Sequence, residues 1–337
     1  MFYFRTAFHT YEIKGGNRME IKKHLLQVCS PTLKKILTQI SPQQFEEIEE
    51  IRIRSYKPLL IKHRKGEDFL TARGKWTKFP EEGYSCVMED ITLTLELMSD
   101  YSLYAFEEEI KNGYITLLGG HRVGLTGKVI VEKGQVKALR YISGLNIRIS
   151  HEKIGCADSI IPYLLCETSI YHTLIVSPPG CGKTTLLRDI IRQISNGISS
   201  RCSGLTVGVV DERSEIAGCY QGIPQKDIGI RTDVLDGCPK VEGMMMLLRS
   251  MAPQVIAVDE IGHEKDIYAI ENVLNAGCKI ICTVHGNSIE DLQQKPVLST
   301  LLKKNIFERI IFLSHRQGPG TLEKIIDGTD LERKRIC

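Results

Sequence analysis

The chain has 337 residues, of which 42% are hydrophobic and 25% are charged, and its formal net charge is +3. These proportions are typical of a globular protein of about two domains, and they exclude disordered, collagen-like and fibrous proteins. The nearly balanced net charge also argues against an obligate nucleic-acid binder, because such proteins are usually strongly basic.

The N-terminal part of the chain begins without regular periodicity and then becomes helical. Residues 1–18 follow neither the helical nor the strand period and are expected to form an irregular extension. After them, Ser30 and Ser41 each precede a proline, the order typical of an N-cap followed by the first helical position. Ser41 and Gln44 also have the spacing of a capping box, which predicts a helix that reaches Ile48.

The next segments mix helical and strand-like patterns. Residues 51–54 alternate apolar and basic side chains and resume as an apolar run at 58–61, which predicts a half-buried antiparallel strand. Apolar runs punctuated by glycine, up to Ile149, predict hairpins. Between them we expect helices around 91–98 and 103–110 and a strand at 114–118. The sequence therefore predicts a smaller α+β N-terminal domain over residues 19–152.

From about residue 155 the pattern changes to short apolar runs that alternate with helical segments. This alternation is the signature of a parallel sheet with helical crossovers. The predicted strands are 173–177, 205–210, 255–258, 280–284 and 309–313, and the predicted helices include 159–165, 184–194, 241–250 and 265–276. The fold class expected for residues 153–337 is therefore α/β, with a mostly parallel sheet.

A glycine-rich loop follows the first of these strands and opens a helix. Its residues are Ser177, Pro178, Pro179, Gly180, Cys181, Gly182, Lys183, Thr184 and Thr185. This is the context of a phosphate-binding loop: glycines let backbone N–H groups point at phosphates, Lys183 reaches the β and γ oxygens, and Thr184 offers a hydroxyl to Mg²⁺. Ser177 stands where the motif has its first glycine. The thiol of Cys181, inside the loop, is either an oxidisable brake on binding or incidental.

Two carboxylates follow the buried strand at 255–258. Ligands of a parallel sheet bind beyond the carboxyl ends of its strands, so Asp259 and Glu260 are expected at the same edge as the phosphate loop. Asp259 is predicted to hold the hydration shell of Mg²⁺, and Glu260 to orient and deprotonate the attacking water. Together with the loop, this is the arrangement of an ATPase.

Two further strand ends carry polar residues. One strand is followed by the acidic segment 211–215, which we interpret as organising Mg²⁺ or water, with a solvated loop as the alternative. Another strand ends in His285, which we interpret as a sensor of the γ-phosphate rather than a structural histidine.

The cysteines and the hydropathy pattern indicate the compartment. The 11 cysteines are odd in number and form no CxxC pair, so neither a disulfide framework nor a zinc site is predicted. Cys278 and Cys282 share one face of a predicted strand and are expected simply to pack. The sequence has no apolar stretch near the roughly 18 to 20 residues that span a bilayer, and no signal-peptide pattern. We expect a cytoplasmic protein that can dock peripherally on the inner face of a membrane.

The order of these segments resembles that of a known group of enzymes. The phosphate loop, DERSE, AVDE and TVHG, with Arg249 ahead of Pro253, resemble the boxes of the secretion-type traffic ATPases of type II and type IV systems. The strings VVDERSEIAG, RTDVLDGCPK, APQVIAVDEIG and AGCKIICTVHG, with EIRIRSYKPLLI in the N-terminal half, are similar to one branch, the stage III sporulation protein AA family. This resemblance spans most of residues 19–330.

The resemblance implies a RecA-like P-loop ATPase domain that binds ATP and Mg²⁺. It also implies a homo-oligomer in the form of a hexameric ring. The implied partners are membrane-embedded sporulation channel proteins in the mother cell of an endospore-forming bacterium.

The resemblance also assigns residues by position. The phosphate-loop role falls on Lys183 and Thr184, the acidic box on Asp211, Glu212 and Glu215, Walker B on Asp259 and Glu260, and the histidine box on His285. Asp211 thereby joins Thr184 and Asp259 as a candidate Mg²⁺ ligand. Arg231 and Arg249 resemble family arginines near the nucleotide or the seam between subunits. In the N-terminal domain, Arg122 and Arg148 are candidates to stabilise charge on the γ-phosphate, with a solvated surface as the alternative.

Three functions remain open from the sequence. The first is an ATP-hydrolysing motor that couples domain closure to assembly or transport by a membrane-embedded complex. The second is a nucleic-acid-binding RecA-like ATPase, although the sequence shows no appended single-strand-binding module and the basic residues of 51–75 are typical of a solvated face. The third is a nucleotide-gated assembly scaffold with little turnover.

Overall fold

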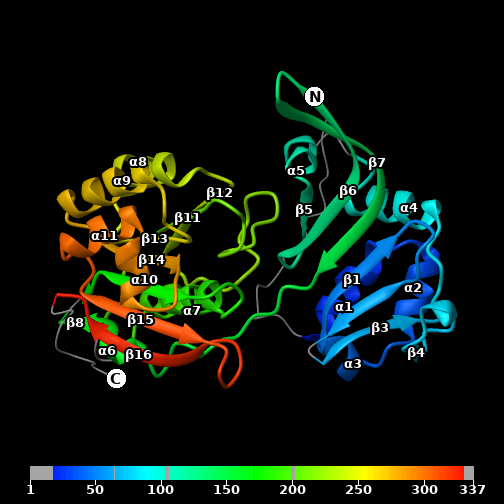
Figure 1. Ribbon diagram of the computed structural model, residues 1–337, viewed down its shortest axis with the longest axis horizontal. Helices are drawn as coiled ribbons and strands as arrows, with labels where there is room; N and C mark the ends of the chain where they lie inside the picture. The colour runs from blue at the N-terminus through cyan, green and yellow to red at the C-terminus, as the bar shows by residue number, and fades with distance from the viewer. Residues whose placement is uncertain (1–17, 64, 103–105, 168, 199–201, 330–337) are drawn as a thin grey trace, which may run out of the picture. The chain divides into compact units, whose positions relative to one another are not determined.

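A computed structural model describes residues 18–63, 65–102, 106–167, 169–198 and 202–329 of the chain (Figure 1). The chain divides into two compact units, Met1–Ser150 and His151–Cys337. Across the described ranges, none of the helices combines the length and the apolar character needed to cross a membrane.

The N-terminal unit is built on a seven-stranded sheet in the order β4-β3-β2-β1-β7-β6-β5, in which every neighbouring pair is antiparallel. Its strands are β1 (Ile48–Arg54), β2 (Leu60–His63), β3 (Gly66–Leu70), β4 (Trp76–Thr77), β5 (Tyr114–Leu117), β6 (His121–Glu132) and β7 (Gln135–Arg148). Its helices are α1 (Arg18–Gln27), α2 (Pro31–Thr38), α3 (Pro42–Glu46), α4 (Met88–Met98) and α5 (Glu107–Lys111), with a 3₁₀ turn at Pro80–Glu82. One face of the central strands is buried, as the apolar half of their alternation requires.

The helix starts in this unit follow the predicted capping. The hydroxyl of Ser30 accepts the N–H of Leu33, and Ser41 and Gln44 form the capping box. The prediction that the second helix reaches Ile48 was wrong, because α3 ends at Glu46 and Ile48 already starts β1.

The prediction that residues 51–54 and 58–61 form a single strand was also wrong. These residues form two strands, β1 and β2, which pair antiparallel. The chain reverses at Tyr56, which has a left-handed φ of 58° although the turn contains no glycine, and the turn signal in the sequence was Pro58, which interrupts the run. The helix predicted at 103–110 is present as α5, while residues 103–105 lie outside the described part of the chain.

The C-terminal unit contains a mixed, mostly parallel sheet of seven strands in the order β12-β11-β13-β14-β10-β15-β16. All neighbouring pairs are parallel except β15 and β16. The strands are β10 (Thr173–Ser177), β11 (Val207–Asp211), β12 (Thr232–Asp236), β13 (Val255–Val258), β14 (Lys279–His285), β15 (Arg309–Ser314) and β16 (Thr321–Asp327), with a separate pair β8 (Leu165–Cys166) and β9 (Ser169–Ile170). This confirms the predicted α/β class and the smaller, antiparallel N-terminal part.

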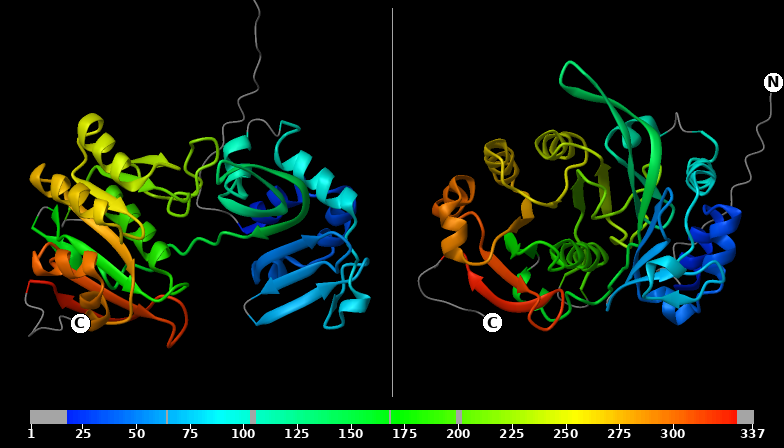
Figure 2. Two further views of the ribbon diagram at one scale, coloured as in Figure 1. Left: turned by 45° about the horizontal axis from the view of Figure 1, so that its top comes forward. Right: turned by 45° about the vertical axis from the view of Figure 1, so that its right-hand side comes forward.

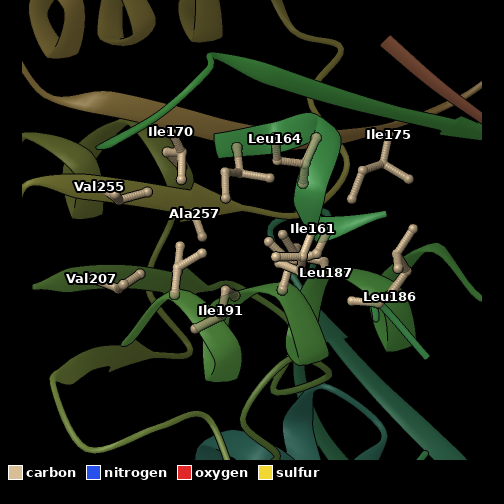
Figure 3. Packing of buried hydrophobic residues seen from close by; sticks show 14 of the residues in the cluster. Ile161, Leu164, Ile170, Ile175, Leu186, Leu187, Ile191, Val207, Val255 and Ala257 are labelled. Atoms are coloured by element: carbon tan, nitrogen blue, oxygen red, sulfur yellow. The ribbon is translucent and has the colours of Figure 1, made fainter. Parts of the chain in front are cut away.

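Helices cover both faces of this parallel sheet (Figure 2). They are α6 (Ile161–Leu164), α7 (Lys183–Asn196), α8 (Lys240–Ser250), α9 (Glu264–Asn275), α10 (Ile289–Gln294) and α11 (Pro296–Lys303). On one face α6 and α7 pack against alternate strand residues such as Ile175 and Ala257, as Figure 3 shows. On the other face α8, α9, α10 and α11 pack against the intervening residues, such as Val176 and Val258. Both faces of the strands are therefore buried, as their continuous apolar sequence predicts.

The structure contains elements that the sequence pattern did not reveal. All five predicted strands are present, with bounds that differ by at most two residues. The strands β12 and β16 were missed because both lie at sheet edges, where half-buried and polar residues stand in place of an apolar run. The helices α10 and α11 were missed too, and α6 is shorter than predicted. Cys278 and Cys282 are buried in the core, as expected.

The parallel order brings four predicted segments to one edge of the sheet. The phosphate loop follows β10, the acidic segment follows β11, and Asp259 and Glu260 follow β13. His285 ends β14, directly opposite Ser177 at the end of β10. Because the carboxyl ends of parallel strands share an edge, this is where a ligand site is expected.

Candidate nucleotide site

The loop between β10 and α7 requires glycine at two positions. Gly180 and Gly182 have φ angles of 73° and 79°, in the left-handed region that other residues rarely adopt. A Cβ atom on Gly182 would also lie 3.3 Å from the backbone nitrogen of Gly320, whose N–H donates to the carbonyl of Cys181 at 3.0 Å. Ser177 lies outside the left-handed region, so a side chain is tolerated where the motif has its first glycine.

The loop leads into the N-terminus of a long helix. Lys183 is the first residue of α7, which has 14 residues, and its side chain is 7% exposed. The loop between β10 and α7 contains Pro178, Pro179 and Cys181, and Thr185 lies in the first turn of α7. The first N–H groups of a helix lack intrahelical partners and carry partial positive charge, so this end of α7 favours an anion.

Asp259 lies between two threonine hydroxyls. The hydroxyl of Thr184 donates to Oδ2 of Asp259 at 2.7 Å, and the hydroxyl of Thr283 donates to Oδ1. Thr184 lies in the first turn of α7 and Thr283 lies in β14, so the carboxylate links the phosphate loop to the neighbouring strand. The predicted Mg²⁺ partners Thr184 and Asp259 are thus in contact.

The backbone of Glu260 adopts a conformation that is unusual for its residue type. Its φ is 53°, in the left-handed region, and its N–H donates to the hydroxyl of Thr283 at 2.9 Å. A non-glycine residue held in this region stores strain, and such residues cluster at functional sites. The turn directs the Glu260 carboxylate toward the phosphate loop.

Three cationic or hydrogen-bonding groups surround the Glu260 carboxylate. Oε1 lies 3.3 Å from Nζ of Lys183 and 2.9 Å from Nε2 of His285, and Oε2 lies 2.5 Å from Nη1 of Arg213. Partial burial acts to raise the pKa of Glu260, but the charges of Lys183 and Arg213, with a smaller effect of His285, outweigh it and hold the pKa below its usual value. Glu260 is therefore an ionised carboxylate at the centre of the site.

The residues present can take part in binding Mg²⁺ but cannot enclose it. Within the described ranges, no group of three or more His, Cys, Asp or Glu side chains could hold a metal ion. Mg²⁺ commonly uses one or two protein ligands together with water and substrate phosphates. The Thr184 hydroxyl and the Asp259 carboxylate offer the oxygen ligands that such a site needs.

Asp211 is engaged by the backbone of its own loop. Its Oδ1 accepts the N–H of Glu215 at 2.8 Å, and its Oδ2 accepts those of Ile216 and Ala217 at 3.0 and 2.8 Å. Burial raises the pKa of Asp211 against the opposing effect of these three donors. The arrangement favours a structural role in holding the loop over the predicted Mg²⁺ ligation.

Replacing Asp211 by alanine is therefore expected to lower the stability of the folded protein. Three buried backbone donors would lose their acceptor, at a cost of about 2 to 4 kcal/mol. Thermal unfolding measures this loss, with Asp233→Ala as control because Asp233 is exposed on β12. A raised Mg²⁺ requirement with unchanged thermal stability would instead support the ligand role.

The other two acidic residues of the segment, Glu212 and Glu215, have partners other than Glu260 in the structure. Glu212 accepts a hydrogen bond from Nζ of Lys240 at 2.7 Å, and Lys240 is the first residue of α8. Glu215 is exposed, and its carbonyl accepts a hydrogen bond from the buried side chain of Arg188 in α7. Among the described residues, no hydrogen bond or ion pair joins Glu212 to Glu260 or to the phosphate loop, so its catalytic role in the acidic box stays a prediction.

The structure does not bring Arg231 or Arg249 to the phosphate loop. Nη1 of Arg231 donates to the carbonyl of Ser195 at 2.8 Å, in the last turn of α7. A helix of 14 residues is about 20 Å long, so this turn is far from the loop at its start. Arg249 is exposed in the last turn of α8, which runs from the carboxyl edge of the sheet to the amino end of β13. A role of either arginine at a seam between subunits stays a prediction.

Arg122 and Arg148 belong to the N-terminal unit. The guanidinium of Arg122 lies 3.6 Å from the centre of the Tyr114 ring, and Nε of Arg148 lies 3.8 Å from Oε1 of Glu50. Their predicted role toward the γ-phosphate also stays a prediction.

Sequence reasoning missed Arg213. The segment DERSE was interpreted through its carboxylates, whereas its arginine makes the contact to Glu260. A basic residue inside an acidic segment at a strand end was the available signal.

The thiol of Cys181, inside the phosphate loop, is buried. Burial raises the pKa of this thiol against the opposing effect of Lys183, which argues against a reactive thiolate.

Comparison with known protein families finds one match over most of the chain. The family described as "Sporulation stage III, protein AA" matches residues 19–332. Stage III sporulation protein AA of Bacillus subtilis (strain 168) is 46% identical over 303 residues, which are 90% of this chain and 94% of that protein.

Solved structures give a likeness of fold. The ATPase DotB of Legionella pneumophila is similar with a TM-score of 0.52 at 16% identity, over 79% of this chain and 72% of that chain. The ATPase DotB of Yersinia pseudotuberculosis is similar with a TM-score of 0.55 at 14% identity, over 98% of this chain and 84% of that chain. At such identities the likeness concerns the fold alone.

Proposed function

The chain belongs to the stage III sporulation protein AA family, as its resemblance predicted, and from this membership we propose that it is a Mg²⁺-dependent ATPase. The fold shared with the DotB ATPases supports the proposal. The observation that carries it is the convergence of Lys183, Glu260 and His285, whose polar atoms lie within 3.4 Å of one another beside the phosphate loop.

In the proposed reaction the phosphates of ATP lie over the loop and the N-terminus of α7. Lys183 binds the β and γ oxygens, and His285 contacts the γ-phosphate from the end of β14. Glu260 orients a water molecule and accepts its proton, while the water oxygen bonds to the γ-phosphorus and the bond from that phosphorus to ADP breaks. Thr184 and Asp259 are the residues that would hold Mg²⁺, which would supply positive charge beside the phosphates.

We also propose a domain arrangement, an oligomeric state and a cellular role, which the family membership suggests. Residues 153–337 form the RecA-like ATPase domain and residues 19–152 the N-terminal domain. The extension predicted over residues 1–18 lies outside the described residues except for Arg18, which begins α1. The protein works as a homo-oligomer, of hexameric form, on membrane-embedded channel proteins of a sporulating cell, from the cytoplasmic side. Hydrolysis then powers assembly or transport by that complex.

Phosphate release from ATP, with and without single-stranded DNA or RNA, tests this function. We expect turnover that ignores nucleic acid and rises steeply with protein concentration, because a ring assembles by mass action. Strong stimulation by single strands would indicate a nucleic-acid motor. Nucleotide binding without turnover would indicate a scaffold and would contradict the ATPase proposal.

Replacing Thr184 by alanine is expected to raise the Mg²⁺ concentration needed for half-maximal turnover. The variant loses one oxygen ligand and the hydrogen bond that orients Asp259, and losses of this kind cost about 10 to 100-fold in metal affinity. Turnover against Mg²⁺ concentration at saturating ATP measures the shift. Thr300→Ala, on α11, is the control and should follow the wild-type curve. A Thr184→Ala curve that coincides with wild type would remove Thr184 from the Mg²⁺ site.

A further inference from the structure

We propose that Arg213 is a catalytic arginine of this site, which binds the reacting γ-phosphate from within the same chain. The inference rests on the ATPase function proposed above and adds a residue that the sequence resemblance did not assign. Its starting point is the contact between Nη1 of Arg213 and Oε2 of Glu260 at 2.5 Å.

The donors around Glu260 are those that a phosphoryl group in transfer requires. Lys183 and His285 contact one carboxylate oxygen, and Arg213 contacts the other. In phosphoryl transfer the negative charge spreads over three equatorial oxygens, so several donors arriving from different directions stabilise it. Lys183 arrives from the phosphate loop, His285 from β14 and Arg213 from the loop after β11. Arg213 therefore brings a third positive or donor group to the reacting phosphate.

The loop that carries Arg213 has a fixed backbone. On one side of it, Asp211 accepts backbone N–H groups of the residues from Glu215 to Ala217. On the other side, Ser214 has a left-handed φ of 52°, and its hydroxyl donates to Asp236 at 2.6 Å. Only the side chain is exposed, at 58%, so it can exchange one partner for another while its base stays in place.

A guanidinium is the appropriate group for this exchange. Its planar fork of N–H donors matches both carboxylate and phosphate oxygens, and it stays protonated at any working pH. A phosphate in transfer carries more negative charge than the single charge of Glu260, so the guanidinium gains by moving toward it.

The test compares full-length wild type, Arg213→Ala and Arg213→Lys, with Arg73→Ala as control because Arg73 is an exposed arginine of the N-terminal unit. Three quantities are measured: kcat and KM for ATP, the dissociation constant for ADP, and the trapping of ADP with aluminium fluoride, which mimics the phosphoryl group in transfer. For Arg213→Ala we expect kcat to fall about 100-fold or more. The ADP dissociation constant should stay within about threefold of wild type, because ADP has no γ-phosphate for Arg213 to bind.

Trapping distinguishes a catalytic arginine from a structural one. Arg213→Ala should lose the ADP–aluminium fluoride complex, and Arg213→Lys should recover part of both trapping and kcat, because it keeps the charge without the fork. Trapping at the wild-type level, with kcat unchanged or raised, would show that Arg213 only restrains Glu260 and would overturn the proposal. Equal loss of ADP binding in both variants would overturn it too, since ADP has no γ-phosphate.

The outcomes also separate this inference from the function on which it rests. If wild type neither hydrolyses ATP nor binds ADP, the ATPase proposal fails and the role of Arg213 fails with it. If wild type hydrolyses ATP and Arg213→Ala matches it in kcat and trapping, only the role of Arg213 is refuted.

Discussion

Replacing Lys183 by alanine is expected to abolish productive nucleotide binding. Its buried ammonium group stands at the start of α7, 3.3 Å from Glu260, where the helix N-terminus attracts the same phosphate charge. Alanine removes the cation that meets the β and γ oxygens and leaves the Glu260 carboxylate less neutralised beside an incoming polyanion. The dissociation constant for ATP should rise at least about 100-fold, which is about 2.7 kcal/mol. Calorimetric titration with ATP measures it.

The control for this variant is Lys303→Ala. Lys303 is exposed at the end of α11, where the chain returns to the amino edge of the sheet, so its loss should leave ATP affinity unchanged. Thermal unfolding of both variants shows whether the fold is retained. A folded Lys183→Ala protein that binds ATP within about threefold of wild type would mean that the loop does not hold phosphates through this lysine.

The central part of the fold could be predicted from apolar runs alone. Strands such as β10 and β13 are buried on both faces and therefore carry uninterrupted apolar sequence. The edge strands β12 and β16 are only partly buried, and their residues need no such pattern. The pairing of β1 with β2 depends on a turn at Tyr56 that has no glycine, and Pro58 directly after it was the local sign of the reversal.

The site could be predicted as far as it depends on strand ends. Lys183, Glu260 and His285 follow or end neighbouring parallel strands, and the geometry of such a sheet alone brings them together. Side-chain direction after a strand end was beyond reach, because the turn that follows decides it. Asp211 turns back to its own backbone, whereas Arg213 two residues later reaches Glu260.

Two arginines were placed by resemblance and could have been tested against topology. α8 leaves the carboxyl edge after β12 and must return to the amino edge before β13, so Arg249 in its last turn lies at the edge opposite the phosphate loop. The same reasoning applies to Arg231, which directly precedes β12 and contacts the end of α7. For Arg249 the predicted order of strands and helices already contained this information, whereas for Arg231 the argument needs β12, which the sequence pattern did not reveal.

Replacing Glu260 by glutamine is expected to leave ATP binding intact and to stop turnover. The amide is nearly isosteric with the carboxylate and can still accept a hydrogen bond from Lys183, but it cannot accept the proton of the attacking water. General-base catalysis contributes about 100 to 10,000-fold, so kcat should fall by about that factor. The dissociation constant for ATP should stay the same or decrease, because the variant removes a negative charge beside the γ-phosphate. Phosphate release and calorimetric titration, run on the same preparation, measure both.

The choice of glutamine separates the roles of this residue. A loss of kcat could also follow if the strained turn at Glu260 changed its conformation. Glutamine, however, keeps the side-chain length, and the backbone N–H at this position still donates to the hydroxyl of Thr283. Glu290→Gln, on the exposed first turn of α10, makes the same change of charge and should hydrolyse ATP at the wild-type rate. Substantial hydrolysis by Glu260→Gln would refute Glu260 as the base. The positive groups around it would then act on the phosphate directly, and water activation would have to come from another acceptor at the same sheet edge, such as Asp259 or His285.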